Sequence, residues 1–209
     1  MPKGLIRYRQ AGDFHFAAFS CYHRQQHLGT PAARHLFVQS LEATRLRYEF
    51  FIAGCVVMPE HLHLLLGEPR GALLAKALQA LKLSVAAQSR QRPFWQRRYY
   101  DFNVYTEAKR VEKLRYMHRN PVTRGWAANP EAWPWSSFRH CATGEIGAVE
   151  IESSWTARHR GGLPASLMVR PGIPPTHISE ARCRPPAQVS ILRPGHPHPH
   201  PLQTRYAKM

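Results

Sequence analysis

Acidic side chains are scarce in this sequence. Its 209 residues include 13 Asp and Glu against 29 Lys and Arg, which gives a formal net charge of +16. This imbalance argues against an acidic or metabolite-only role and favours a polyanionic partner, with nucleic acid ahead of anionic lipid. The alternative is a basic surface that is simply well solvated.

Long apolar runs and paired cysteines are also missing. No uninterrupted apolar run reaches the ~18 residues of a membrane-spanning helix, and the first residues lack the apolar segment of a secretory signal. The four cysteines (Cys21, Cys55, Cys141 and Cys183) form no Cys-x-x-Cys pair, so neither a zinc knuckle nor a disulfide framework is indicated. We therefore expect a cytoplasmic protein with no membrane partner.

The length and composition indicate one domain with an extension. With 44% hydrophobic residues the chain can bury one core. Residues 155–209 contain ten of the 18 prolines and no sustained apolar periodicity. We expect a folded domain over residues 1–150 and a Pro/His-rich, disordered extension over residues 151–209. His196, His198 and His200 are more typical of a polyproline-like tail than of a metal site.

A His-x-His pair lies in the most apolar stretch of the chain. His61 and His63 alternate with Leu62, Leu64 and Leu66. Side chains alternate across a strand, so both imidazoles should project from one face while the leucines fill the other. Two imidazoles on one face supply two of the ligands of a divalent-metal site. Two histidines that share a sheet face by chance are an equally good interpretation of the spacing alone.

The order of the periodic segments predicts an α+β fold. Period-2 and period-3.6 patterns alternate as strand, helix, strand, strand, helix, strand and helix. The short Pro59-Glu60 connection favours a hairpin between the second and third strands. This is the ferredoxin-like split β-α-β pattern, with an antiparallel sheet and helices on one side. The expected elements are strands over 14–22, 50–58, 61–66 and 94–105, and helices over 31–47, from Gly71, and over 106–119, where Pro121 stops the last one.

Basic residues gather between Arg90 and Arg124, where ten Lys or Arg face only three acidic residues. Aromatic residues are interleaved with them, a mixture suited to following a phosphate backbone and stacking unpaired bases. We expect core packing to claim at least half of these aromatics. Lys82, on the preceding helix, is either a surface lysine or a phosphate contact. The expected DNA-binding residues are Lys82, Arg97, Arg98, Lys109, Arg110, Arg115 and Arg119.

Tyr116 and Asn120 are four residues apart on the last expected helix, so they share one helix face. A lone tyrosine on an amphipathic helix is normally a packing residue. Its combination with the His pair and a basic, aromatic surround favours a role in chemistry.

Four blocks of the sequence together resemble a known family. They are residues 58–66, 94–101, 116–126 and 133–137. In this order they are similar to the IS200-like single-tyrosine transposases of the HUH superfamily, and more closely to the REP-associated tyrosine transposases. The resemblance covers roughly residues 8–145 and does not extend to the Pro/His-rich extension.

The resemblance implies a role for each matching residue. His61 and His63 match the metal ligands, Tyr116 the nucleophile and Asn120 a third, polar ligand. The implied function is a transposase that cleaves and rejoins single-stranded or hairpin DNA through a 5′-phosphotyrosine. Two imidazoles and an amide oxygen suit Mg²⁺ or Mn²⁺, and the histidines tilt the site toward Mn²⁺.

Two other functions fit parts of the pattern. A hairpin-binding protein derived from such an enzyme would keep the basic face without cleaving, and a metal-dependent nuclease would use water as the nucleophile. Only the tyrosine mechanism leaves a covalent protein–DNA adduct. The sequence leaves open whether the site assembles in a monomer or across a homodimer.

Overall fold

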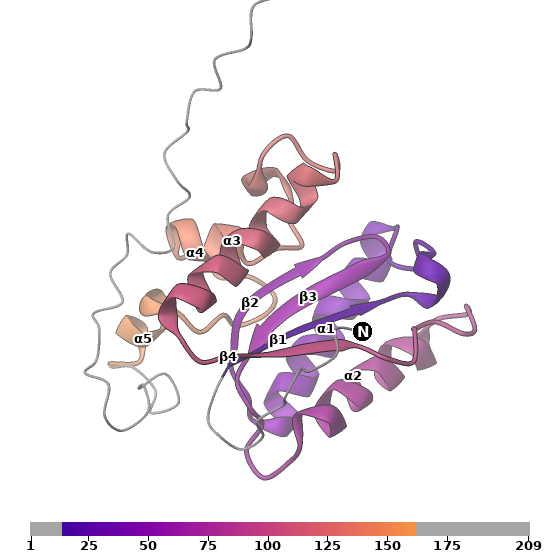
Figure 1. The fold of residues 1–209 in the computed structure, drawn as a ribbon, viewed down its shortest axis with the longest axis horizontal. Coiled ribbons are helices and arrows are strands. Elements are labelled where there is room, and N and C mark those ends of the chain that lie inside the picture. Colours follow the sequence, from indigo (N-terminus) through magenta and orange to yellow (C-terminus); the bar gives the residue numbers. More distant parts are fainter. Residues whose placement is uncertain (1–13, 162–209) are drawn as a thin grey trace, which may run out of the picture.

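The computed structural model describes residues 14–161, which form one antiparallel sheet with helices on both of its faces (Figure 1). The strand order is β2-β3-β1-β4. This is the arrangement expected for a ferredoxin-like split β-α-β fold, so the predicted fold class is confirmed. The two helices of the split β-α-β core lie on one side of the sheet as expected, and the additional helix that carries Tyr116 covers the other side. The elements are β1 (Phe14–Ser20), η1 (Tyr22–Arg24), α1 (Pro31–Tyr48), β2 (Ile52–Val57), β3 (His61–Leu66), α2 (Leu74–Gln88), β4 (Tyr100–Val104), α3 (Glu107–Thr123), η2 (Pro130–Ala132), α4 (Phe138–Thr143) and α5 (Ser154–His159).

The two faces of the sheet carry separate hydrophobic cores. On one face α1 and α2 pack against alternate strand residues such as Phe19, Leu62 and Leu64. On the other face α3 crosses the sheet and contributes Leu114 and Met117. Figure 1 shows α3 on the opposite side of the sheet from α2. Because both faces are covered, every residue of β2 and β3 is buried.

The β2–β3 hairpin fixes which way the two histidines point. The strands pair antiparallel, with Val56 opposite His63 and Val57 opposite Leu62. Leu62 and Leu64 belong to the core under α1 and α2, whereas Leu65 belongs to the core under α3. Alternation therefore places the imidazoles on the α3 face, as the sequence predicts.

Gly54 allows α3 to lie close to the sheet. A Cβ atom at this position would lie 2.5 Å from Cδ2 of Leu114 and 2.8 Å from Cε of Met117. The register of β2 against β3 also shifts between Ile52 and Gly54. A residue without a side chain at this irregularity lets the helix that carries Tyr116 approach β2.

Helix α3 continues through Pro121 to Thr123, so the expectation that the proline stops the helix is wrong. A proline inside a helix loses one hydrogen bond, because it has no N–H to donate. The turn beyond it is held by the bond from the Arg124 N–H to the Asn120 carbonyl (3.0 Å) and by burial of Asn120 and Pro121. The side chain of Asn120 therefore sits on a complete helical turn.

Residues 133–137 cover the free edge of β2. The N–H of Val57 donates to the carbonyl of Trp135 (2.9 Å), and the N–H of Ser137 donates to that of Cys55 (2.9 Å). The Arg34 guanidinium lies 3.9 Å from the centroid of the Trp135 ring. This block closes an edge of the sheet, which explains its tryptophans by packing.

The ordered domain extends beyond the expected boundary at residue 150. Val149 and Ile151 are buried in the core under α1 and α2. The N–H of Glu152 donates to the Ile52 carbonyl (2.7 Å), and Ser153 caps α5. Residues 151–161 are therefore not disordered. The remainder of the predicted extension lies outside the described residues.

Strand and helix limits differ from the expected ones by a few residues, and most at β4. The aromatic block predicts a strand from residue 94, but the strand begins at Tyr100. Trp95 makes only an isolated bridge to Cys21, and its ring packs in the core. None of the helices in residues 14–161 is long and apolar enough to cross a membrane.

Candidate functional site

The His61 and His63 side chains meet on the α3 face of the sheet. Their ring centroids are 4.9 Å apart, and the two residues are 5% and 6% exposed. Nδ1 of His61 lies 2.9 Å from Oε1 of Glu60. A proton on Nδ1 satisfies this carboxylate and leaves a lone pair on Nε2, which is the tautomer that a metal-binding histidine needs.

Helix α3 brings Tyr116 and Asn120 to these histidines. The Tyr116 ring stands edge-on to the His63 ring at a centroid distance of 5.2 Å, and edge-on to Phe16 at 6.1 Å. Nδ2 of Asn120 lies 3.3 Å from Nε2 of His63. Tyr116 is 51% exposed although its partners are buried. The four residues that the sequence singles out for chemistry therefore form one cluster.

Three buried polar atoms at this cluster lack a hydrogen bond among the described residues. They are Oε2 of Glu60, Nδ1 of His63 and Oδ1 of Asn120. A buried polar atom left without a partner costs about 1–3 kcal/mol, so such a concentration is typical of a site that is completed by a ligand.

The donor set fits a divalent cation. Residues 14–161 contain no group of three His, Cys, Asp or Glu side chains that could hold a metal. The candidate set therefore needs the amide oxygen of Asn120 beside the two imidazoles. Amide oxygen and nitrogen can exchange places by a flip, and Oδ1 of Asn120 has no hydrogen bond within the described residues.

Both histidines are held neutral. Burial lowers the pKa of His63 to about 3, with help from His61, Arg124, Lys113 and Arg24. Burial also lowers the pKa of His61, against the opposing carboxylate of Glu60. Neutral imidazoles keep their lone pairs available to a cation without first losing a proton.

Three cations lower the pKa of His63, and the sequence does not assign them to the histidine pair. Arg124 and Arg24 act on the pKa of both histidines, and Lys113 acts on that of His63. The Lys113 ammonium lies 5.2 Å from the centroid of Phe16. Arg24 has φ of 55°, in the left-handed region, within the turn that follows β1. The residues next to Arg24 in the sequence do not indicate that it lies near the histidines.

The seven expected DNA-binding residues are distributed unevenly. Arg97, Arg98, Arg115 and Arg119 are exposed and make no ion pair with other described residues. Lys109 pairs with Glu112, with 2.7 Å between Nζ and Oε2. These side chains remain candidates for contact with a phosphate backbone.

Arg110 and Lys82 have structural partners instead. Arg110 is 9% exposed, and its Nε and Nη2 each donate to the Glu107 carboxylate at 2.8 Å. Nζ of Lys82 donates to the Gln96 carbonyl at 2.7 Å, and α2 carries it on the face of the sheet opposite Tyr116. Neither the Arg110 nor the Lys82 side chain belongs to the cluster around His63.

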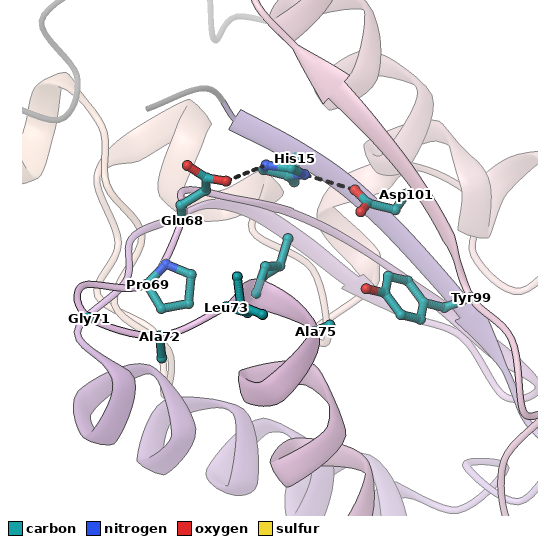
Figure 2. Close-up of a pocket in the computed structure, with 10 residues that line it drawn as sticks. His15, Glu68, Pro69, Gly71, Ala72, Leu73, Ala75, Tyr99 and Asp101 are labelled. Atoms are coloured by element: carbon teal, nitrogen blue, oxygen red, sulfur yellow. Dashed lines mark hydrogen bonds and ion pairs between the residues drawn. The ribbon is translucent and has the colours of Figure 1, made fainter. Parts of the chain in front are cut away.

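A second polar cluster lies on the α2 face. Figure 2 shows His15 between Glu68 and Asp101, beside a cavity of about 300 Å³ that Tyr99 also lines. Nδ1 of His15 is 2.8 Å from Asp101, and Nε2 is 3.3 Å from Glu68. Two carboxylates on different nitrogens of one imidazole make an ion-pair bridge that joins β1, β4 and the segment after β3.

The fold and the cluster together define an α+β protein whose sheet histidines face a helical tyrosine. No family model matches the chain. The chain is 26% identical to the REP-associated tyrosine transposase of Escherichia coli (strain K12) over 133 residues, which are 63% of this chain and 80% of that protein. It is also 26% identical over 125 residues to a Haemophilus influenzae protein that is provisionally given the same name. That match covers 53% of this chain and 71% of that protein.

A solved structure shares the fold. A REP-associated tyrosine transposase bound to a REP hairpin superposes with a TM-score of 0.60 at 22% identity, over 71% of this chain and 90% of that one. The chain is a distant homologue of the REP-associated tyrosine transposases.

Proposed function

We propose that this protein is a DNA strand transferase that cleaves and rejoins single-stranded or hairpin DNA through Tyr116. The observation that carries the proposal is the position of this tyrosine. Its ring is half-exposed and contacts the buried His63, which itself lies 3.3 Å from Asn120. The Tyr116 hydroxyl makes no hydrogen bond with the described residues, so its oxygen is accessible to a phosphodiester.

The proposed reaction is a transesterification. The Tyr116 hydroxyl loses its proton to solvent, and its oxygen attacks the phosphorus of a phosphodiester. The bond from phosphorus to the 3′ oxygen breaks, and that oxygen takes up a proton to become a free 3′-OH. The products are a 5′-phosphotyrosine and a 3′-OH, so the number of phosphoester bonds is conserved and the reverse attack rejoins the strand.

His61, His63 and Asn120 would hold the divalent cation, Mg²⁺ or Mn²⁺, that such a reaction uses. When bound, it supplies charge that offsets the negative charge developing on the phosphate oxygens. The chain's own contribution is orientation. Glu60 fixes the His61 tautomer through the 2.9 Å contact, and the turn beyond Pro121 fixes Asn120.

The basic surface supports the choice of substrate. Arg24, Lys113 and Arg124 place positive charge around the histidine pair, where a phosphate would be neutralised. The exposed Arg97 and Arg98 can follow a backbone further away. The related protein of known structure is bound to a REP hairpin, and we extend that hairpin substrate to this chain as part of the proposal.

The test is the covalent adduct. Wild type incubated with Mn²⁺ and 5′- and 3′-labelled hairpin oligonucleotides with single-stranded flanks should give a protein–DNA band that survives denaturation. Tyr116→Phe should give neither band nor cleavage. Tyr105→Phe is the matched control, because Tyr105 is exposed and lies on the connection between β4 and α3.

The other outcomes separate the alternatives. Cleavage without an adduct in both proteins identifies a nuclease that uses water. Hairpin binding with no cleavage across a panel of hairpins identifies a binding protein in which the reaction is absent. An adduct on another tyrosine, found by mass spectrometry of the DNA-linked peptide, keeps the reaction and overturns the assignment of Tyr116.

A further inference from the structure

An open cavity of about 520 Å³ lies beside the turn that carries Arg24. One wall is the turn between β1 and α1, and the other is the segment before β4. The described residues of its lining include no carboxylate and are rich in side-chain amides: Tyr22, Gln25, Gln26, His27, Gln91, Arg92 and Pro93. Amides carry both a donor and an acceptor on one plane, as do the edges of nucleobases.

Backbone hydrogen bonds tie the two walls to the sheet. The N–H of Tyr22 donates to the Phe94 carbonyl and the N–H of Cys21 donates to the Glu60 carbonyl, both at 2.9 Å. Nδ1 of His27 lies 3.1 Å from the Phe94 carbonyl, and the two rings pack with centroids 5.0 Å apart. The cavity is therefore held open by the fold and does not depend on a ligand for its shape.

The same turn joins the cavity to the histidine cluster. His23 and Arg24 have φ of 49° and 55°, a left-handed conformation that non-glycine residues rarely adopt. The N–H groups of Cys21 and Leu28 donate to the carbonyls of Glu60 and Pro59, both at 2.9 Å, so the segment that contains Arg24 is tied to the start of the His61 strand. Arg24 contributes to lowering the pKa of both histidines, while its neighbours line the cavity. A strand whose phosphate lies at Arg24 would thus have an adjacent nucleotide at the cavity.

Two of the amides have no hydrogen-bond partner among the described residues. Within residues 14–161, the side chains of Gln26 and Gln91 make no hydrogen bond, whereas Gln25 is engaged by His27 at 2.8 Å. Gln26 and Gln91 come from opposite walls. Tyr22 is 37% exposed and adds an aromatic face, so the lining offers hydrogen bonding and stacking together.

We propose that this cavity binds one unpaired nucleobase of the DNA strand, next to the phosphodiester that Tyr116 attacks. The inference rests on the proposed function for the position of that phosphodiester. Tyr22 stacks on the base, and Gln26 and Gln91 bond to its edge. Adenine is the preferred base, because a glutamine amide bonds simultaneously to its N6 and N7.

The test uses the full chain and a pool of hairpin DNA with randomised single-stranded flanks. Wild type should enrich adenine at one unpaired flank position. The double variant Gln26→Ala/Gln91→Ala should lose this enrichment and keep the rest of the selected sequence. Gln39→Ala, an exposed glutamine on α1, is the matched control and should select as wild type does.

Stacking gives a second measurement. With the selected hairpin, Tyr22→Ala should weaken binding roughly 5- to 100-fold, and Tyr22→Phe should not. Replacing the selected base by an abasic site should weaken wild-type binding by a similar factor. The same replacement should weaken binding by Tyr22→Ala by a clearly smaller factor, because that variant has no ring on which the base could stack and keeps only the contacts of Gln26 and Gln91 to its edge.

The outcomes distinguish this inference from the proposed function. If the adduct on Tyr116 forms but the double variant selects the same flank bases as wild type, the cavity does not read a base and the inference is overturned. If wild type forms no adduct but enriches adenine, and Gln26→Ala/Gln91→Ala loses this enrichment while Gln39→Ala keeps it, the cavity binds a base in a protein that does not cleave. Enrichment of no base, or of a base other than adenine at the position that the double variant affects, contradicts the stated preference.

Discussion

The side-chain amide of Asn120, on α3, lies 3.3 Å from Nε2 of His63, on β3, although 57 residues separate the two in the sequence. This contact joins the helix that carries Tyr116 to the strand that carries the His pair. Asn120 has one further polar atom, Oδ1, that is buried and has no hydrogen bond among the described residues. The amide oxygen is therefore available as a ligand for a cation that would also bind His63.

Asn120→Ala should raise the Mn²⁺ concentration needed for half-maximal cleavage by at least about 10-fold, because the variant has no ligand oxygen at this position. Asn120→Asp keeps an oxygen and adds negative charge, so it should need no more Mn²⁺ than wild type. Hairpin affinity, measured without metal, should change little in either variant. His61→Ala and His63→Ala should abolish cleavage. An Ala variant at position 120 with a normal Mn²⁺ requirement would remove this residue from the ligand set.

His15 should make the stability of the protein depend on pH. Burial by itself lowers the pKa of His15, but the hydrogen bond and charge of Asp101, together with Glu68, outweigh burial and raise the pKa above the ordinary 6.5. A histidine with a raised folded pKa stabilises the fold fully below its unfolded pKa, and this stabilisation is lost as pH rises through the folded pKa.

His15→Asn removes this component. The free energy of unfolding of wild type should therefore exceed that of the variant most below about pH 6.5, and the difference should shrink as the pH rises. Urea unfolding of both proteins between about pH 6 and about pH 9 measures the difference. Because other histidines titrate equally in the two proteins, their contributions cancel. A difference that stays constant with pH would show that folding does not shift the pKa of His15.

Local patterns are enough to predict the order of the elements and the pairing of chemistry-bearing residues within each element. The alternation at His61 and His63 and the four-residue spacing of Tyr116 and Asn120 depend only on the geometry of one strand and one helix. The fold class follows from the order of these elements. The order of elements does not predict that α3 crosses the face of the sheet opposite α1 and α2. This crossing brings the Tyr116 and Asn120 pair into contact with the His61 and His63 pair.

Side chains whose roles depend on distant partners cannot be assigned from local sequence. His15 and Asp101 are 86 residues apart, and nothing near either of them indicates the ion pair. Arg24 lies in a turn whose left-handed backbone has no local sequence marker, and Arg110 looks like any other arginine of the basic region until its burial is known. Val149 and Ile151 are only two apolar residues, which is too few to form a recognisable strand or helix pattern. The predicted domain boundary at residue 150 therefore falls before the end of the packed segment.

The segment from Val149 to α5 should contribute to stability. Burial of a Val or Ile side chain stabilises by about 1.5–3 kcal/mol, and both Val149 and Ile151 lie in the core. A chain that ends at Gly147 should therefore unfold at clearly lower urea concentration than the full chain. A chain that ends at Gly161 keeps all the packing of the described residues and should match the full chain in unfolding and in cleavage. Equal stability of the two truncated chains would contradict the role of this segment.

The structure separates arginines that the sequence groups together as DNA contacts. Arg97 and Arg98 are exposed, whereas Arg110 is buried and bound to Glu107 through two hydrogen bonds of 2.8 Å. Arg97→Ala/Arg98→Ala should weaken hairpin binding for every sequence. It should also reduce the slope of log affinity against log salt by about 0.7 for each phosphate that the variant no longer neutralises. Its stability should stay within about 0.5 kcal/mol of wild type, as for other surface changes.

Arg110→Ala should behave in the opposite way. It removes two charge-assisted hydrogen bonds on the first turns of α3, so it should lower the free energy of unfolding by about 1 kcal/mol or more. Hairpin affinity and its salt slope should stay near those of wild type in conditions where the variant is folded. Fluorescence anisotropy at several salt concentrations and urea unfolding, carried out on both variants, give the two readouts. A folded, normally stable Arg110→Ala protein with a flattened salt slope would return Arg110 to the DNA-binding face.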